Sequence, residues 1–229
     1  MANPVSLTEP QVRILYKIPL FRNLPLNIKD VLLDKLDYTV KEFARGEIVA
    51  RQDTPCIHLM VLLKGELEVN IIDAAGSKVK VENLCAPRAF ATPHLFSENN
   101  IFPATFFAKE DVVLFKATRE SFFKLISGEP DILKSFLAIT GNCNHCTVTR
   151  LRILSFKGIR TRFIYYLMEH RRDENTSVLE HNQVELAEYL GVSRPALSKE
   201  INALIKEHLI SVDKKEVKLL NMGGLLREL

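Results

Sequence analysis

The sequence predicts an α+β protein with an all-β N-terminal part, a long connecting helix and a small C-terminal helical part. Three observations support this fold class. Short strand-like runs fill residues 38–116, apolar residues recur every seven positions from Ile132 to Ile153, and two capped helical patterns adjoin in residues 182–209. We expect a β-roll domain over residues 1–126, a long helix and hinge over 127–156, and a winged helix-turn-helix over 157–229.

Composition limits the class of protein. The chain has 229 residues, of which 47% are hydrophobic, enough for one or two packed domains. No apolar run is long enough to cross a bilayer and no export signal starts the chain, so we expect a cytoplasmic protein without a membrane partner. The four cysteines are therefore expected to be reduced thiols.

The distribution of charge is more informative than the net charge of +3. Residues 1–149 contain 17 basic and 17 acidic residues, whereas residues 150–229 contain 14 basic and 11 acidic residues. The whole basic excess therefore lies in the C-terminal part. A cluster there can neutralise phosphates or form a solvated surface: Arg150, Arg152, Lys157, Arg160, Arg162, Arg171 and Arg172.

The N-terminal part predicts a jelly-roll-like double-stranded β-helix. Its short runs are separated by turn signals such as Arg45-Gly46, Lys64-Gly65 and the segment 73–76. Residues 18–36 are expected to form a short helical lead-in, and residues 1–15 carry no clear signal. The expected strands are Lys41–Phe43, Glu47–Arg51, Ile57–Leu63, Glu66–Ile72, Lys78–Leu84 and Val112–Lys116.

The segment Ser121–Leu154 predicts helix, with a long helix starting near Pro130. It carries two apolar stripes, one through Ile132, Phe136, Ile139, Cys143, Cys146 and Ile153, the other through Leu133, Leu137, Thr140, Thr147, Leu151 and Leu154. Two stripes indicate two packing partners. The candidate partners are the β-roll of the same chain and the matching helix of a second copy.

The C-terminal part predicts two helices joined by a tight turn. Asn182 and Glu185 form a capping-box pattern, Gly191 ends the first helix, and Ser193 with Pro195 begins the second. Val184, Leu186, Ala187 and Leu190 of the first helix and Ala196, Leu197, Ile201, Leu204 and Ile205 of the second are expected to face inward. A hairpin around residues 213–216 follows, as in a winged helix.

The outward face of the second helix is short, polar and basic, as a helix that enters the major groove of DNA requires. Lysines at the hairpin turn suit phosphate contacts. The expected DNA contacts are Ser193, Arg194, Pro195, Ser198, Lys199, Asn202, Lys214 and Lys215.

These residues carry a resemblance to a known family. The pairs Leu186-Ala187 and Leu209-Ile210, with the runs Leu190–Arg194 and Leu197–Ile201, resemble the helix-turn-helix of the Crp/Fnr family of bacterial transcription regulators. Gly46-Glu47 and the run Leu62–Val69 stand where that family's sensor domain has them. The resemblance implies a cyclic-nucleotide-binding-domain-like sensor, a homodimer on palindromic double-stranded DNA, and RNA polymerase as a partner.

The chain departs from the family's nucleotide-binding branch at the phosphate pocket. By this match, Ala91-Thr92 replaces the family's Gly-Glu pair and Phe102-Pro103-Ala104 replaces its Arg-Ser-Ala. An anionic phosphate buried without these partners would cost several kcal/mol, so cyclic AMP is not the expected effector. Phe90, Thr92, His94, Phe96, Phe102 and Phe106 are the effector-pocket candidates. Their side chains either fill the pocket in which the family binds a nucleotide, or they bind an apolar or planar ligand. Heme, as in nitric-oxide-responsive regulators of the family, is one example of such a ligand.

The sequence also contains candidate residues for a heme or redox site. His58, Met60, His94 and His145 are candidate heme ligands, and Cys143 and Cys146 are candidate redox residues, but we assign no metal site. Family members with an iron–sulfur cluster use N-terminal cysteines; none precedes Cys56 here, so no cluster is expected. No catalytic motif stands at a telling position, so an enzyme is not expected.

Two functions follow from the sequence. The first is an effector-controlled, sequence-specific transcription regulator. The alternative is a sensor or scaffold that does not bind DNA and acts through protein contacts. The nucleotide-binding members carry Arg, Glu and Arg where this chain has Arg194, Pro195 and Lys199, and proline cannot accept a hydrogen bond from cytosine. A different DNA site is therefore expected at that base pair.

Overall fold

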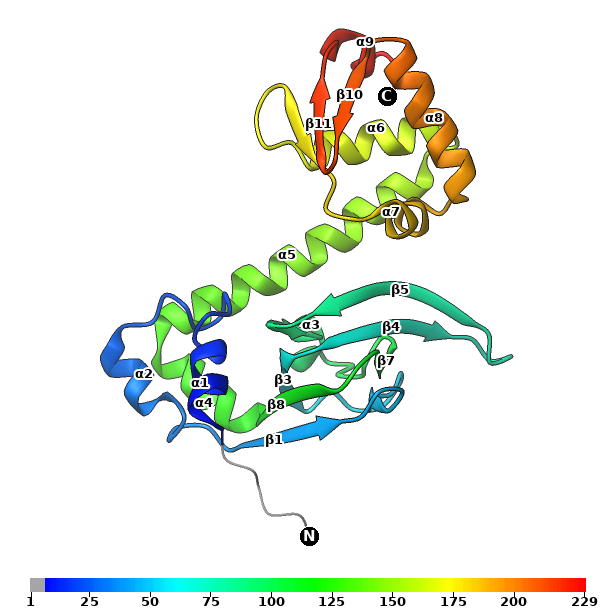
Figure 1. The fold of residues 1–229 in the computed structure, drawn as a ribbon. Helices are drawn as coiled ribbons and strands as arrows, with labels where there is room; N and C mark the ends of the chain where they lie inside the picture. Colours follow the sequence, from blue (N-terminus) through cyan, green and yellow to red (C-terminus); the bar gives the residue numbers. More distant parts are fainter. Residues whose placement is uncertain (1–6) are drawn as a thin grey trace. The chain divides into compact units, whose positions relative to one another are not determined.

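A computed structural model of the chain describes residues 7–229, apart from the side chains of Leu26, Asn27, Asp30 and Cys146. The chain forms two compact units that divide between Asn144 and His145, within helix α5 (Pro130–Ser155) (Figure 1). The α+β class is confirmed, with a β-rich N-terminal unit and a helix-turn-helix in the C-terminal unit. The finer division at residues 126 and 156 stays a prediction.

The first unit is a roll of two four-stranded antiparallel sheets. One sheet has the order β1-β8-β3-β6 and the other β2-β7-β4-β5 (Figure 1). The strands are β1 (Tyr38–Phe43), β2 (Ile48–Ala50), β3 (His58–Lys64), β4 (Glu66–Ile72), β5 (Lys78–Cys85), β6 (Arg88–Phe90), β7 (Thr105–Ala108) and β8 (Val112–Thr118). The jelly-roll-like prediction agrees with this pairing.

Strand β3 is apolar along most of its length because both of its faces are buried. Met60 and Leu62 pack toward the opposite sheet, whereas Leu59 and Val61 pack into a second core. That second core includes residues of the flanking helices. The helices of this unit, apart from the start of α5, are α1 (Glu9–Leu15), α2 (Leu26–Leu32), α3 (Thr92–Leu95) and α4 (Arg119–Gly128).

The predicted lead-in helix is only partly correct. Helix α1 lies in residues 9–15, where the sequence shows no clear signal, and within residues 18–36 only α2 is an α-helix. Pro19 and Pro25 break the earlier part of that segment, because proline lacks the N–H that a helix interior needs. Strands β6 and β7 were not predicted, since their aromatic residues were interpreted as pocket residues.

The second unit packs helices α6 to α9 and a small sheet around one core. Phe163, Tyr166, Leu167, Leu190 and Leu204 are among its fully buried residues. The sheet has the order β10-β11-β9, which places the predicted hairpin beside a third strand. The elements are α6 (Ile159–Glu169), β9 (Thr176–Val178), α7 (Gln183–Leu190), α8 (Arg194–Lys206), β10 (Ile210–Asp213), β11 (Glu216–Leu219) and α9 (Met222–Leu226).

The two apolar stripes of helix α5 differ in how far they are buried. Ile132 and Phe136 of the first stripe are buried in the first unit, and Ile153 is buried in the second. Most of the second stripe is exposed, with Leu137 and Leu151 59% and 64% exposed, whereas Thr140 and Leu154 are half-buried. Cys143 is exposed, and the side chain of Cys146 lies outside the described residues. An exposed apolar stripe of this kind is a candidate partner surface.

Candidate nucleic-acid interface

The turn between α7 and α8 is held by local caps. Asn182 Oδ1 accepts hydrogen bonds from the N–H groups of Val184 (2.9 Å) and Glu185 (3.0 Å), and Glu185 Oε2 accepts from Asn182 N–H (3.0 Å). The predicted capping box is therefore confirmed. Gly191 is left-handed at φ 65°, with its N–H donating to Glu188 O and that of Val192 to Ala187 O. This pair of bonds is a Schellman motif and stops α7 sharply.

Helix α8 presents the predicted polar face. Ser193 caps it by accepting from Ala196 N–H (3.4 Å), and Pro195 lies in its first turn. Ser193, Arg194, Pro195, Lys199 and Asn202 are exposed and Ser198 is half-buried. The N-terminal residues of such a helix are the ones that reach base edges in the major groove.

Most of the predicted inward face of this helix pair is buried, but two assignments are wrong. Leu197 and Leu204 are buried, whereas Ile205 is 36% exposed. Val184, in the first turn of α7, is 49% exposed. Val184 lies off the stripe formed by the buried Leu186 and Leu190, so helical position outweighs its apolar character.

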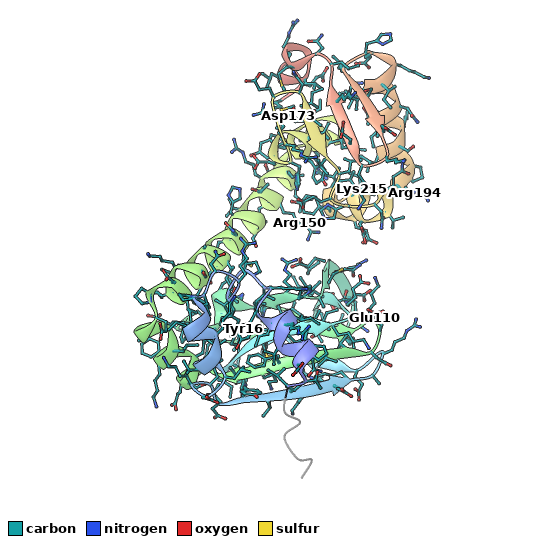
Figure 2. All side chains as sticks on the ribbon, turned by 60° about the vertical axis from the view of Figure 1, so that its left-hand side comes forward. Tyr16, Glu110, Arg150, Asp173, Arg194 and Lys215 are labelled. Atoms are coloured by element: carbon teal, nitrogen blue, oxygen red, sulfur yellow. The ribbon has the colours of Figure 1, made fainter. Side chains whose placement is uncertain are left out.

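Arg194 projects from the first residue of α8, and Lys215 lies in the turn between β10 and β11 (Figure 2). Within the described residues, Arg194 makes one long hydrogen bond, from Nη2 to Gln183 Oε1 at 3.5 Å, and no ion pair with a carboxylate. Lys199 likewise has no carboxylate partner there. Both cations therefore remain available to a base or a phosphate.

The hairpin turn consists of Lys214 and Lys215 between the paired residues Asp213 and Glu216. Lys214 adopts a positive φ of 53°, a conformation that glycine adopts more readily than other residues. Lys215 O accepts a hydrogen bond from Leu179 N–H (2.7 Å), which ties the turn to the segment after β9. Both lysine side chains are exposed, as a phosphate contact requires.

Most side chains of the basic cluster, which precedes this site in the sequence, interact with partners within the chain. Arg160 forms ion pairs with Glu207 (2.7 Å), Glu200 (3.3 Å) and Glu228 (3.4 Å). The hydrogen bonds that Arg160 donates to the carboxylate of Glu207 are the main reason that the pKa of Arg160 is raised above its usual value. With its charge matched three times, Arg160 does not serve as a phosphate ligand in this conformation, which leaves the phosphate role to other members of the cluster. Its ion pair with Glu200 links α6 to α8.

Arg162 interacts with backbone carbonyl groups rather than with carboxylates. Its guanidinium donates to Phe156 O (2.8 Å), Leu190 O (2.9 Å) and Leu154 O (3.2 Å). A fourth contact reaches Gly191 O at 3.5 Å. These carbonyls lie at the C-terminal ends of α5 and α7, where helices leave acceptors unsatisfied and the helix dipole favours a cation. One side chain therefore joins the end of the long helix to the helix-turn-helix.

Two other arginines of the cluster lie over aromatic rings. The guanidinium of Arg150 lies 5.3 Å from the ring centre of Tyr189, and that of Arg152 lies 5.1 Å from the ring centre of Tyr165. Both distances suit cation–π contacts. Lys157, Arg171 and Arg172 remain exposed. Four of the seven basic residues of the cluster therefore have partners within the chain, so the basic surface of the second unit depends on fewer side chains than the sequence indicates.

A buried hydrogen-bond group lies at the entrance to α7. Tyr166 Oη accepts from Glu180 N–H (3.1 Å) and lies 3.1 Å from His181 Nδ1. Burial raises the pKa of Tyr166 to about 12. Burial also lowers the pKa of His181, although the carboxylate of Glu180 opposes this shift. A neutral imidazole that accepts the Tyr166 hydroxyl proton satisfies both groups.

The interior of the β-roll is filled by aromatic rings. Phe106 lies with its ring centre 4.9 Å from that of Phe90 and 5.9 Å from that of Phe102. Met60 is buried in the same core and pairs with Phe90 across the strands. A packed ring thus occupies position 102, which the sequence match alone aligns with the family's phosphate-binding guanidinium.

Phe96 does not join this group of rings. It packs against Phe122, Phe123 and Phe136 with ring centres 5.5–6.3 Å away, and these residues belong to α4 and α5. Its ring is 38% exposed. The six pocket candidates therefore do not converge on one site, because Phe96 lies with the helices.

The loop that carries the other candidates keeps part of the expected backbone. Ala91 is left-handed at φ 53°, although it is not glycine. Its methyl group thus occupies the approach that a glycine would leave open to a phosphate. Thr92 is buried at the start of α3, and His94 is half-buried with its pKa lowered by burial. The carboxylate and guanidinium of the nucleotide-binding branch have no counterpart at these positions.

The remaining metal candidates lie apart. His145 is exposed, with Nε2 3.9 Å from Glu169 Oε2. Among the described residues, no three or more His, Cys, Asp or Glu side chains are grouped so that they could hold a metal ion. Because the rings of Phe90, Phe102 and Phe106 fill the roll around Met60, the residues present do not fit an enclosed heme there. No helix in the described part of the chain could span a membrane.

Comparisons with known proteins follow the same two parts of the chain. The cyclic nucleotide-binding domain matches residues 40–129, and the Crp-like helix-turn-helix domain matches residues 161–228. The probable transcriptional regulator flp of Lacticaseibacillus casei is 24% identical over 208 residues, covering 89% of this chain and 92% of that protein.

Solved structures share the fold. The Thermus thermophilus Catabolite Activator Protein has 21% identity and a TM-score of 0.53, over 92% of this chain and 97% of that one. A CooA mutant from Carboxydothermus hydrogenoformans has 18% identity and a TM-score of 0.62, over 86% and 88% of the two chains.

The fold and the exposed face of α8 thus define a transcription regulator with a sensor domain and a DNA-binding helix-turn-helix. The chain belongs to the Crp/Fnr family of transcription regulators.

Proposed function

We propose that this chain is a homodimeric regulator that reads a palindromic DNA site through Arg194 and Lys199, and that its sensor responds to an effector other than cyclic AMP. The observation that carries the proposal is the exposed face of α8, whose two cations form no ion pair with a carboxylate in the part of the chain described. A dimer would place two such faces about one turn of DNA apart. RNA polymerase is the expected protein partner on the promoter.

Binding-site selection from random duplexes, followed by affinity measurements, tests the DNA proposal. Arg194→Ala should cost about 1–3 kcal/mol on the selected site and relax specificity at one base pair. Arg171→Ala is the control, because Arg171 is exposed in the same unit but outside the proposed face. Equal affinities for the two variants would contradict the assignment of Arg194.

The same selection tests the role of Pro195. Pro195 offers no acceptor to a cytosine amino group, so the half-site should differ from that of the nucleotide-binding members at one base pair. Recovery of the same half-site would contradict this prediction. Affinity that barely changes with salt would instead favour the alternative class, a sensor or scaffold that acts through protein contacts.

The exposed stripe of α5 supports the homodimer. Leu137 and Leu151 are more than half exposed on one helix, and a matching helix of a second copy would bury them. Leu137→Glu should weaken self-association measured by sedimentation equilibrium. Asn142→Glu adds the same charge to the exposed part of α5 outside this stripe and should leave the dimer intact. A wild-type-like dimer in the Leu137→Glu variant would contradict the proposed seam.

The input side is tested with ligands. Cyclic AMP at millimolar concentration should leave the unfolding temperature of the sensor unchanged, because the phosphate partners are replaced by Ala91, Thr92 and Phe102. Titration with heme tests the apolar-ligand alternative; because the rings of Phe90, Phe102 and Phe106 fill the roll around Met60, we expect no heme bound through Met60 or His94. A Soret band that both Met60→Leu and His94→Ala abolish would support heme, and its absence would favour the filled pocket.

A further inference from the structure

A cavity of about 440 Å3, widely open to solvent, lies in the first unit between strand β2 and strands β3 and β8. Its apolar wall includes Ile48, Met60 and Phe102. Volumes of this size hold small organic ligands, which are usually oriented by a few polar groups on an apolar wall. The cavity is thus large enough for such a ligand, and its lining combines apolar side chains with the polar groups of Arg51, Thr54, His58 and Lys116.

Two basic side chains reach this cavity from neighbouring strands. His58 of β3 pairs with Thr118, and Lys116 of β8 pairs with Met60, so the two bases are diagonal neighbours on one face of the sheet. Both side chains are half-buried. Arg51 adds a third basic group to the lining.

The charges around these bases are mostly positive. Burial lowers the pKa of Lys116, and the charge of Lys41 on β1 lowers it further. Burial also lowers the pKa of His58, with contributions of the same sign from Lys116 and Lys41 that Asp37 opposes. In the described residues, neither Lys116 nor Lys41 has a carboxylate partner within ion-pair distance. A partly buried ammonium without a counter-charge is costly, and an anion in the cavity would offset that cost.

We propose that this cavity binds a small organic anion, with its carboxylate against Lys116 and His58 and its apolar body against Ile48, Met60 and Phe102. The ligand class follows from the lining, because two adjacent donors suit the two oxygens of one carboxylate. A neutral molecule would leave the bases unmatched, and an inorganic anion would leave the apolar wall in contact with water.

The cavity is connected to the centre of the roll. Asp53 N–H donates to Phe102 O (2.9 Å), and Phe102 N–H donates to Thr54 O (3.0 Å). These bonds join Asp53 and Thr54, at the cavity wall, to Phe102, whose ring packs on that of Phe106. A ligand in the cavity therefore contacts the core that replaces the nucleotide pocket. A role as the effector site rests on the proposed regulator function, whereas binding of the anion does not.

Nuclear magnetic resonance of the full chain tests the proposal, with hexanoate as the probe and hexanamide as its neutral isostere. Hexanoate should shift the His58 imidazole signals saturably and raise the pKa of His58, because the carboxylate stabilises the imidazolium. Hexanamide should do neither. Equal shifts with both molecules, or none with hexanoate, would overturn the site.

Variants locate the binding. Lys116→Met removes the ammonium but keeps an unbranched side chain, and Lys116→Gln provides a second replacement should the first disturb folding. Each should weaken hexanoate binding at least about tenfold, the loss of one charge-assisted hydrogen bond. The exposed lysine at position 124 in α4 provides the control, and Lys124→Gln should bind like the wild type.

Unchanged affinity in a folded Lys116 variant would overturn the proposal. The effector role is measured separately, as the change in affinity for the selected DNA site on adding hexanoate. Binding without such a change would reject the effector role and leave the anion site standing. If the chain binds no DNA site, the regulator function fails, while the hexanoate titration still decides whether the anion site exists.

Discussion

Replacement of Arg162 by alanine should destabilise the second unit more than the loss of any exposed arginine. In the folded chain its guanidinium connects the C-terminal end of α5, at Leu154 and Phe156, to the C-terminal end of α7, at Leu190. Alanine leaves these carbonyls without a donor and also removes the cation from two helix C-termini.

The magnitude follows from the three contacts of 3.2 Å or less. A hydrogen bond that involves a charged group contributes about 1.5–3 kcal/mol. Three such bonds would contribute at least about 4.5 kcal/mol. Because Arg162 is only half-buried, water can replace part of each bond, so we take a total somewhat below that value, about 3–4 kcal/mol. For a unit of this size, that loss lowers the melting temperature by roughly 15–25 °C.

Differential scanning calorimetry of the full chain measures this change in the transition assigned to the second unit, and hydrogen exchange of α7 checks its location. Arg162→Lys should recover less than half of the loss, since one ammonium cannot span both helix ends. Arg171→Ala is the matched control. If Arg162→Ala melts within a few degrees of Arg171→Ala, the three bonds contribute little and the reasoning is refuted.

Three further predictions concern the same unit. Asn182→Ala removes both cap bonds of α7 and should cost about 1 kcal/mol in the free energy of unfolding measured with urea. Gly191→Ala should cost about 1–3 kcal/mol in the same assay, because a Cβ there meets Leu154 Cδ2 at 2.9 Å in a left-handed backbone. Since burial lowers the pKa of His181, the unfolded chain binds more protons, so stability is complete above about pH 6.5 and falls as the pH drops below it.

Each of the three has its own control. Asn182→Asp keeps the cap oxygen and should retain most of the stability, whereas equal losses for alanine and aspartate would argue against the cap. Asn at position 191 tolerates a positive φ better than alanine, so Gly191→Asn should separate backbone strain from steric contact. His181→Gln should flatten the melting temperature of the second unit between pH 5.5 and 7.5; an unchanged slope would assign the effect to other groups.

The sequence by itself determined the features whose partners lie close along the chain. The cap of α7 joins Asn182 to Glu185, and its end depends on the left-handed Gly191, so both follow from spacing and residue type. The alternation of apolar and polar residues predicted the antiparallel roll, and the outward positions of α8 predicted the candidate DNA face. These signals are local, because a helix or strand repeats its own geometry every few residues.

Tertiary structure decided which partner each long side chain takes. In the sequence, Arg160 and Arg162 are indistinguishable from phosphate-binding arginines, yet one meets glutamates up to 68 residues away and the other meets carbonyls at two helix ends. In the same way, Phe96 and Phe102 are equivalent pocket candidates until folding places one with the helices and the other inside the roll. A guanidinium or a ring carries no local mark of its partner, because these contacts join segments that only the fold brings together.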